Sequence, residues 1–384
     1  MRHRNSVFHD LLKLVPWAVF DKLVDAYGAD QGTRNFTSRQ HLNALLFAQL
    51  SGAGSLRGIE AAMASHQSRL YHSGVVAPKR STVSDANRNR DFRVFSGLFE
   101  AMLARSGRGL RRKMADAVRL IDSTGLRLAG VGSQRARFST SVFGAKAHVV
   151  YDPDLGRPLY HAVTAANVND ITAAKDMPIE AGATYVFDLG YDDFAWWAKL
   201  DALGCRLVTR FKTNTPLNSL REMPLPPGSA VVSDRIGFLP ARQMMNRKNP
   251  MQDAVREIVV LTETGQTLRL LTNDLDASAD EIADLYKRRW QIELFFRVMK
   301  QTLRITKFVG RSENAVRIQI ALALIAYLLL RALQQITKDV HGFLELVRLV
   351  RANLMHRKDP TRLRNPPPPE PLDPTQLQLS FPST

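Results

Sequence analysis

Between residues 117 and 212 the sequence alternates β-branched runs with short helical segments, in an order that few folds accommodate. Strands are predicted where such runs are bounded by Gly, Pro, Asn or Asp, at 117–128, 145–152, 158–165, 183–191 and 205–212. A helix is predicted at 169–177, after the third strand, and a second at 194–204, after the fourth. This order of elements predicts an α/β protein built on a mixed sheet.

The segments before and after this region have different patterns of residues. Before the sheet, Thr37 and Gln40 resemble a helix-capping box, and Pro16 and Gly28 suit the start and end of another helix. After it, the stretch REIVVL-TETGQ-TLRLLTND predicts a hairpin. We therefore divide the chain into a helical region (1–110), the first part of the sheet domain (111–212), a β-rich insertion (213–278), a second, helical part (279–355) and a Pro-rich tail (356–384).

The chain carries a large excess of positive charge. Lys and Arg number 53 against 36 Asp and Glu, a formal charge of +17. This balance favours a polyanionic partner, nucleic acid before an anionic membrane, although an enzyme with a merely positive surface stays open. A single cysteine, Cys205, excludes an internal disulfide and fits a reducing compartment.

No membrane partner is expected. The most apolar run, IALALIAYLLL at 320–330, is shorter than the about 20 residues that a membrane span needs, so we predict a buried core helix. The N-terminus lacks the pattern of a signal peptide. The expected location is the cytoplasm.

Three acids are candidates for catalysis and metal binding. Asp122 lies inside an apolar strand and Asp188 ends another, where a charge is costly unless it is paired or binds a metal. Strand ends are also where α/β sheets carry their sites. Glu293 lies on a predicted helix. Two strand carboxylates and one helix carboxylate can hold two divalent cations about 4 Å apart, which activate a water or hydroxyl against a phosphodiester.

Glu293 is surrounded by cations. At helical angles Tyr286, Arg289, Glu293 and Lys300 share one stripe. Further basic residues follow at Arg297 and Arg304, and an apolar stripe beside them can face a core: Leu285, Ile292, Phe296, Met299 and Leu303. If the acid faces a metal, its basic neighbours face the phosphates of DNA. The simpler alternative is a set of i,i+4 ion pairs worth a few tenths of a kcal/mol.

A basic helix is also predicted after residue 78. Lys79, Arg80, Arg88 and Arg90 lie among short hydrogen-bonding side chains, namely Ser81, Thr82, Ser84 and Asn87. Such groups contact phosphates and base edges. A capped surface helix with solvated charges fits the pattern equally well.

We assign structural roles to the remaining acids. Asp192 and Asp193 are expected to cap the helix that follows them, Asp170 to cap another, and Asp152 with Asp154 to form a turn. His148 shares a strand face with Lys146 and is either a contact to the site or phosphate, or a satisfied sheet histidine.

The acids in IDSTG and FDLGY together with YKRRWQIELFFRVMK resemble the DDE transposases of bacterial insertion sequences, in particular the family-four type. The motif of that group, Tyr-x2-Arg-x3-Glu-x6-Lys, is met by Tyr286, Arg289, Glu293 and Lys300. The resemblance implies a ribonuclease-H-like catalytic core with a β-rich insertion, preceded by a helical DNA-binding region.

The resemblance also implies an activity. The enzyme would bind terminal inverted repeats, cleave the element's ends with two Mg2+ ions, for which Mn2+ substitutes, and join them to target DNA. Asp122, Asp188 and Glu293 would be the metal ligands, and Tyr286, Arg289 and Lys300 would contact the terminal phosphates and a flipped base. A homodimer would hold the two ends of double-stranded DNA at the bacterial nucleoid. No Trp lies in 213–278, so the residue that stacks on a flipped base is unassigned and a hairpin step stays open.

Two other functions compete with transposition. A nuclease or resolvase on the same core would cleave without joining strands. A transposase-derived DNA-binding protein would not catalyse at all, which the presence of all three acids disfavours.

Overall fold

Nine strands form a single mixed sheet in the order β3-β2-β1-β4-β5-β11-β10-β7-β6. This computed structural model describes residues 5–70, 74–106, 117–127, 144–225, 228–244, 247–303, 305, 309–310, 312–337, 342–360 and 363. The strands have these bounds: β1 Val118–Arg127, β2 Gly144–Asp152, β3 Arg157–Ala165, β4 Thr184–Phe187, β5 Arg206–Arg210, β6 Asn218–Glu222, β7 Val231–Phe238, β10 Val255–Leu261 and β11 Thr267–Thr272. A separate two-stranded sheet pairs β8 (Arg242–Met244) with β9 (Arg247–Lys248).

The first five strands confirm the predicted order of elements and form the ribonuclease-H-like core. Strand β1 runs antiparallel to β2 and parallel to β4, which in turn is parallel to β5. Helix α8 (Asp170–Ala174) precedes β4, and α9 (Phe194–Ala202) connects β4 to β5. Asp193 caps α9 by accepting a hydrogen bond from the Trp196 N–H, as predicted, whereas Asp192, the other predicted cap, pairs instead with Lys212 at 2.5 Å.

The predicted β-rich insertion extends this sheet. The hairpin of β10 and β11 forms as expected, and β11 then pairs antiparallel with β5, with Leu270 opposite Arg210. Strands β7 and β6 follow on the outside of β10. The core and the insertion therefore share one hydrogen-bonded ladder.

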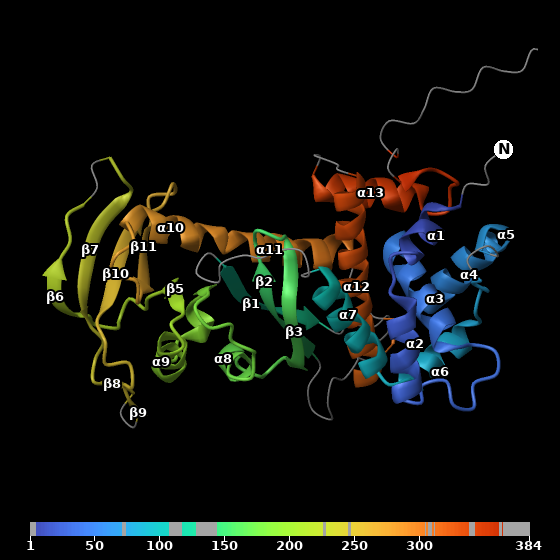
Figure 1. The fold of residues 1–384 in the computed structure, drawn as a ribbon, viewed down its shortest axis with the longest axis horizontal. Helices are drawn as coiled ribbons and strands as arrows, with labels where there is room; N and C mark the ends of the chain where they lie inside the picture. The colour runs from blue at the N-terminus through green and yellow to red at the C-terminus, as the bar shows by residue number, and fades with distance from the viewer. Residues whose placement is uncertain are drawn as a thin grey trace, which may run out of the picture.

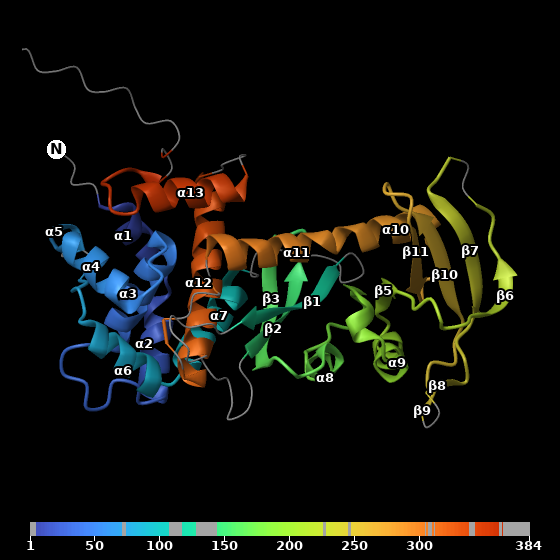
Figure 2. The same cartoon turned by 180° about the vertical axis from the view of Figure 1, so that it is seen from behind.

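The helices have the following bounds: α1 Val7–Leu12, α2 Trp17–Ala26, α3 Ser38–Ser51, α4 Leu56–Ser65, α5 Gln67–Leu70, α6 Arg80–Asn89, α7 Arg93–Ser106, α10 Ala279–Arg288, α11 Trp290–Arg297, α12 Glu313–Thr337 and α13 Phe343–Asn353. Helices α1 to α6 lie at one end of an elongated molecule and β6, β7 and β10 at the other (Figure 1). Helices α10 and α11 run along one face of the sheet, and α8 and α9 lie on the opposite face (Figures 1 and 2).

Each face of the sheet has its own apolar core, because successive side chains of a strand point to opposite sides. Leu120 belongs to the cluster that contains Ile292 and Phe295 of α11, whereas its neighbour Ile121 belongs to the cluster of Trp196 and Trp197 on α9. The alternation continues along β1, so Asp122 and Ser123 also point to opposite faces.

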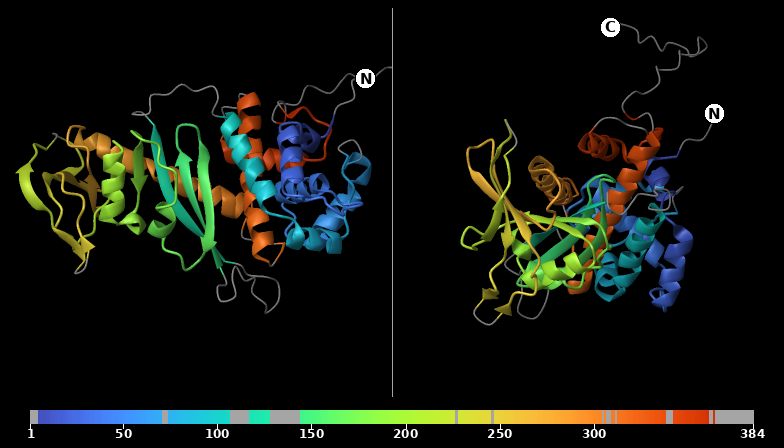
Figure 3. Two further views of the ribbon diagram at one scale, coloured as in Figure 1. Left: turned by 60° about the horizontal axis from the view of Figure 1, so that its bottom comes forward. Right: turned by 60° about the vertical axis from the view of Figure 1, so that its left-hand side comes forward.

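Helix α12 has 25 residues and passes for a membrane span by length and composition, but 83% of its most apolar stretch is buried inside the protein. It runs between the sheet and the N-terminal helices, beside α7 (Figure 3). The expectation of a buried core helix is confirmed.

The N-terminal helices begin and end close to the predicted residues. Thr37 and Gln40 form the predicted capping box at the start of α3. Gly28 follows the end of α2 with a φ of +56°, a conformation that glycine adopts without a steric penalty. Pro16 precedes the first helical residue of α2 instead of being it.

The single helix expected around Glu293 is divided. Helix α10 ends at Arg288, α11 begins at Trp290, and a π-helical turn follows at Val298–Thr302. At the junction the Arg289 N–H donates to the Tyr286 carbonyl, three residues back, and the Ile292 N–H does the same to Arg289. These bonds tighten the helix locally, which hydrophobic periodicity does not reveal.

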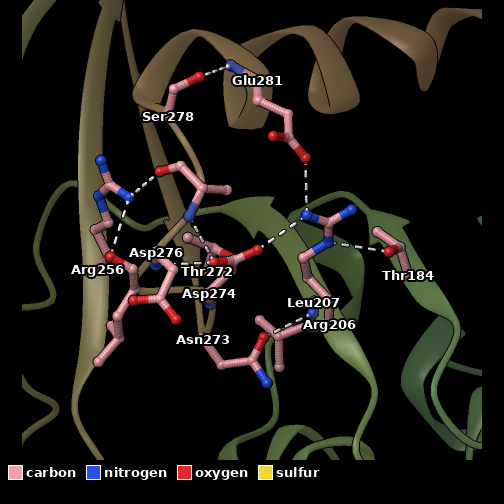
Figure 4. Close-up of polar contacts among 12 residues, drawn as sticks. Thr184, Arg206, Leu207, Arg256, Thr272, Asn273, Asp274, Asp276, Ser278 and Glu281 are labelled. Carbon is pink, nitrogen blue, oxygen red and sulfur yellow. Dashed lines mark hydrogen bonds and ion pairs between the residues drawn. The ribbon is translucent and has the colours of Figure 1, made fainter. Parts of the chain in front are cut away.

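The start of α10 is tied to the core sheet through Arg206 at the beginning of β5. Its guanidinium donates to Thr184 of β4 at 3.0 Å, and it contacts Asp274 and Glu281 at 2.9 Å each (Figure 4). Ser278 caps α10 by accepting from the Glu281 N–H, and Asn273 accepts from the Leu207 N–H (Figure 4). The helix that carries Glu293 is therefore anchored where the insertion returns to the core.

Candidate active site

Asp122 projects from the middle of β1 toward α11. Its side chain is 16% exposed, and one carboxylate oxygen accepts a hydrogen bond from the Ser123 N–H at 2.7 Å. Burial raises the pKa of Asp122 to about 7. The neighbouring carboxylates of Asp188 and Glu293 also raise it, while the Ser123 N–H and the Arg289 guanidinium lower it. A carboxyl in this setting favours a nearby cation or a proton.

Asp188 directly follows β4. The parallel register pairs Leu120 of β1 with Val186 of β4, so two residues further along Asp188 falls beside Asp122. The Asp188 carboxylate accepts from the Gly190 N–H at 2.8 Å and so starts the short 3₁₀ turn Leu189–Tyr191. The order of the sheet thus brings together two acids that are far apart in the sequence.

Glu293 reaches the same place from α11. Arg289 lies between the acids: its guanidinium contacts Glu293 at 2.5 Å and Asp122 at 3.7 Å. It also lies over the Tyr286 ring at 5.6 Å. Burial raises the pKa of Tyr286, the charge of Asp188 raises it further, and Arg289 and Arg210 lower it. Tyr286, Arg289 and Glu293 therefore surround the two aspartates.

No ion pair among the described residues joins the other candidate residues to the three acids. Lys300 is half-buried in the π-helical turn and forms no ion pair with the residues described here. Arg297 is exposed and lies over the ring of Trp290 at 5.8 Å. Lys79, Arg80 and Arg88 are exposed at the start and along α6, at the helical end of the molecule (Figure 1). Arg304 lies outside the described residues, as do the domain boundary near 110 and the Pro-rich tail beyond 363.

Two residues of the basic helix α6 have structural roles. Asn87 is buried and hydrogen-bonds His41 at 2.8 Å. Arg90, at the end of the helix, is buried against Phe36 and lies 3.7 Å from Asp30. Neither of the two interpretations of this helix anticipated that both side chains are buried, because α6 packs against the core on this side.

The residues around Asp122 fit a hard divalent cation by chemistry. Three carboxylates from three elements supply the oxygen ligands that such cations prefer, and burial, with a smaller effect of the neighbouring carboxylates, raises the pKa of Asp122. Across the described part of the chain, however, no three His, Cys, Asp or Glu side chains are arranged to hold one ion. Glu293 instead pairs with Arg289, the i,i+4 partner that the sequence allowed.

A fourth acid, Asp170, lies next to the site, and the prediction that it caps a helix is wrong. Asn169 occupies the cap position of α8, and the Asp170 carboxylate turns away to the sheet. It accepts from the Ser123 hydroxyl at 2.6 Å and from the Lys146 ammonium at 3.0 Å. His148 is fully buried beside it: its Nε2 atom hydrogen-bonds the Thr164 hydroxyl at 2.8 Å, whereas its Nδ1 atom has no hydrogen-bond partner among the described residues. No local pattern marks Asp170, because its partners lie on β1 and β2.

Residues 113–329 match the family model of the transposase DDE domain, more than half of the chain. Together with the fold and the grouped acids, this match places the protein in the DDE transposase family. It is therefore an enzyme of DNA transposition, from a family that generally depends on divalent metal ions. Residues 3–76 match a domain of unknown function, DUF4372.

Two relatives in sequence support this assignment. The chain is 37% identical over 300 residues to the candidate transposase y4zB of Sinorhizobium fredii, covering 77% of this chain and 83% of that one. It is 28% identical over 341 residues to a Geobacillus stearothermophilus protein named as a probable transposase for insertion sequence element IS5377, covering 85% and 84%. A solved piggyBac transposase complex with hairpin DNA has a TM-score of 0.49 at 10% identity, covering 93% of this chain and 81% of that one.

Proposed function

We propose that the protein is the transposase of a bacterial insertion sequence, and that it moves the element by cutting and rejoining DNA. It binds the terminal inverted repeats, hydrolyses the phosphodiester at each end and joins the freed 3′-hydroxyl to target DNA. The observation that carries the proposal is the gathering of Asp122, Asp188, Glu293 and Arg289 at one place on the sheet.

Within this proposal Asp122, Asp188 and Glu293 hold two Mg2+ ions, and Mn2+ can replace them. When bound, the ions activate the attacking water or hydroxyl and stabilise the leaving oxygen. Arg289 neutralises the acids in the structure described here, and its guanidinium suits a phosphate equally well. Tyr286 and Lys300 are assigned to the terminal phosphates and the flipped base.

The parts of the chain divide the work. The helices of residues 1–110 bind the repeat through Lys79, Arg80 and Arg88, which are exposed. Residues 111–212 and 279–355 form the catalytic core, with Arg297 and Arg304 along the path of the DNA, and 213–278 extend the surface available to it. Two protomers bring the two ends together, and the enzyme works on DNA in the cytoplasm, at the nucleoid.

The test is a cleavage assay on a duplex that carries the element's end. Asp122→Asn, Asp188→Asn and Glu293→Gln should each abolish cleavage, because each removes a metal-binding charge while keeping the shape of the side chain. Binding to the same duplex should remain within about threefold of the wild type, since the three substitutions change none of the basic residues assigned to DNA contact. Wild-type cleavage by any of the three variants would overturn the proposal.

A second measurement separates transposition from nuclease activity. Gel analysis of the products should detect the element's 3′ ends covalently joined to a target plasmid. Cleaved ends without joined products would instead favour a nuclease on the same core.

A further inference from the structure

Asp170 contacts both segments that carry the active-site aspartates, but it does so from the opposite face of the sheet. Asp122 points toward α11, whereas Ser123, the next residue, points toward α8 and donates its hydroxyl to Asp170 at 2.6 Å. The N–H of the same Ser123 donates to the Asp122 carboxylate at 2.7 Å. Ser123 therefore joins the two acids through one hydroxyl and one amide.

A similar link leads to Asp188. Gly190 donates its N–H to the Asp188 carboxylate at 2.8 Å. Asp170 packs against the same glycine: a Cβ added at Gly190 would lie 3.1 Å from an oxygen of Asp170 and 3.1 Å from an oxygen of Asp188. Asp170 thus touches the two residues whose amides orient Asp122 and Asp188.

The charge of Asp170 is balanced by β2. Lys146 donates to it at 3.0 Å and to the Val168 carbonyl at 2.9 Å, which holds the ammonium group in place. The Nδ1 atom of the buried His148 lies 3.7 Å away. Three elements, β1, β2 and the turn after β4, therefore converge on this carboxylate.

We infer that Asp170 is a positioning residue for the reaction: it holds Ser123 and Gly190 so that their N–H groups fix the separation and orientation of Asp122 and Asp188. It takes no part in the chemistry itself, because it lies on the other face of the sheet. The inference rests on the proposed function, in which the two aspartates bind the metal ions. Groups that orient metal ligands in this way are worth about 10- to 100-fold in metal affinity or activity.

The test compares Asp170→Ala, Asp170→Asn and a control in the full-length protein. Asp170→Ala should lower end cleavage by about 10- to 100-fold and weaken Mn2+ binding, measured by electron paramagnetic resonance titration, by a similar factor. Binding to the end duplex should stay within about twofold. Asp170→Asn, which can still accept from Ser123, should recover part of both losses. The control is Asp176→Ala, an exposed acid just after the same helix, which should match the wild type.

A double-mutant cycle tests the route through Ser123. Ser123→Ala should weaken Mn2+ binding, and adding it to Asp170→Ala should cause little further loss, because both act on one chain of contacts. Unchanged Mn2+ affinity in Asp170→Ala, or fully additive losses, would overturn the inference. The inference would also be overturned if Asp170→Ala lowered DNA binding and the melting temperature along with cleavage, and Asp170→Asn recovered none of the three.

These outcomes are distinct from failure of the proposed function. Mn2+ binding by the wild type that Asp122→Asn leaves unchanged would refute the metal-ligand assignment itself. A drop in affinity in Asp122→Asn but none in Asp170→Ala would refute only the positioning role.

Discussion

Individual histidines are held neutral in the interior. His41 is fully buried under α6, and burial lowers its pKa to about 3, with a further lowering from Arg90 and an opposing effect of its hydrogen bond to Asn87. Burial likewise lowers the pKa of His148 and of His161 to about 4. In the unfolded chain these histidines bind a proton near pH 6.5, whereas in the folded protein they stay neutral. Each histidine therefore contributes stability that is present above pH 6.5 and is lost as the pH falls toward 4.

We predict that His41→Gln weakens the pH dependence of stability. Below pH 6.5 one buried neutral histidine costs about 1.4 kcal/mol per pH unit, or about 2 kcal/mol between pH 6.5 and 5.0. The free energy of unfolding in urea, measured at pH 7.5 and 5.0, should therefore change by about 2 kcal/mol less in the variant than in the wild type. His356→Gln, at an exposed position, is the control. Equal changes in His41→Gln and the wild type would contradict the prediction.

At the scale of single residues, the sequence identified those whose role can be inferred from their immediate neighbours in the chain. Asp122 and Asp188 were found because each interrupts or ends an apolar strand. Asp170 was misassigned, since its contacts with Ser123 and Lys146 join residues 47 and 24 positions apart. Asn87 looked like a surface residue because the partner that buries it, His41, belongs to another helix.

Among the elements, α10 is anchored at its start by the side chain of a single residue, Arg206. Arg206 joins β4, the loop before α10 and α10 itself through Thr184, Asp274 and Glu281. A side chain with several charged partners at a half-buried position stabilises more than an isolated surface pair does. The anchor holds the near end of the helical segment that continues to Glu293.

We therefore expect Arg206→Ala to lower the free energy of unfolding by about 1–3 kcal/mol, measured by urea denaturation. End cleavage should fall as well, because the helix that positions Glu293 loses its attachment. Lys287→Ala is the matched control: its pair with Glu263 is 3.9 Å long, with side chains 78% and 96% exposed, so the change should stay within about 0.5 kcal/mol. Similar losses in both variants would argue against the anchor.

Helices and strands with a clear hydrophobic period were predicted well. The pairing of strands that are far apart in the sequence was not predicted. The hairpin β10–β11 was visible in its own sequence, but its docking onto β5 depends on residues about 60 positions away. The break at Arg289 was missed for a related reason: Leu285, Ile292, Phe296, Met299 and Leu303 keep their apolar period through it, and all of them are buried as predicted.

For the whole molecule, the effect of the +17 net charge on DNA binding depends on where the exposed cations lie. Lys79, Arg80 and Arg88 are exposed on and beside α6, and none of the three forms an ion pair with a described residue. Lys13, Arg39 and Arg93, on neighbouring helices, are each paired with an aspartate, Asp10, Asp21 and Asp91 respectively. Composition alone could not separate the two groups.

Replacing Lys79, Arg80 and Arg88 with Ala should weaken binding to DNA and flatten its salt dependence. Each lost phosphate contact changes the slope of log affinity against log salt by about 0.9, so the triple variant should differ by up to about 2.7. The triple replacement of Lys13, Arg39 and Arg93 removes the same charge and should change the slope less. Titrations by fluorescence anisotropy at several salt concentrations measure both, and equal slopes in the two variants would exclude α6 as the contact.

The continuous ladder of nine strands limits how the protein can be shortened. An insertion carried on flexible linkers can be deleted and leave its host intact. Here β11 supplies the hydrogen bonds along one side of β5, so removing 213–272 would expose the backbone of a strand that neighbours β4, which Asp188 directly follows. A minimal enzyme built from the first five strands would need a substitute for that edge before it could keep its acids in place.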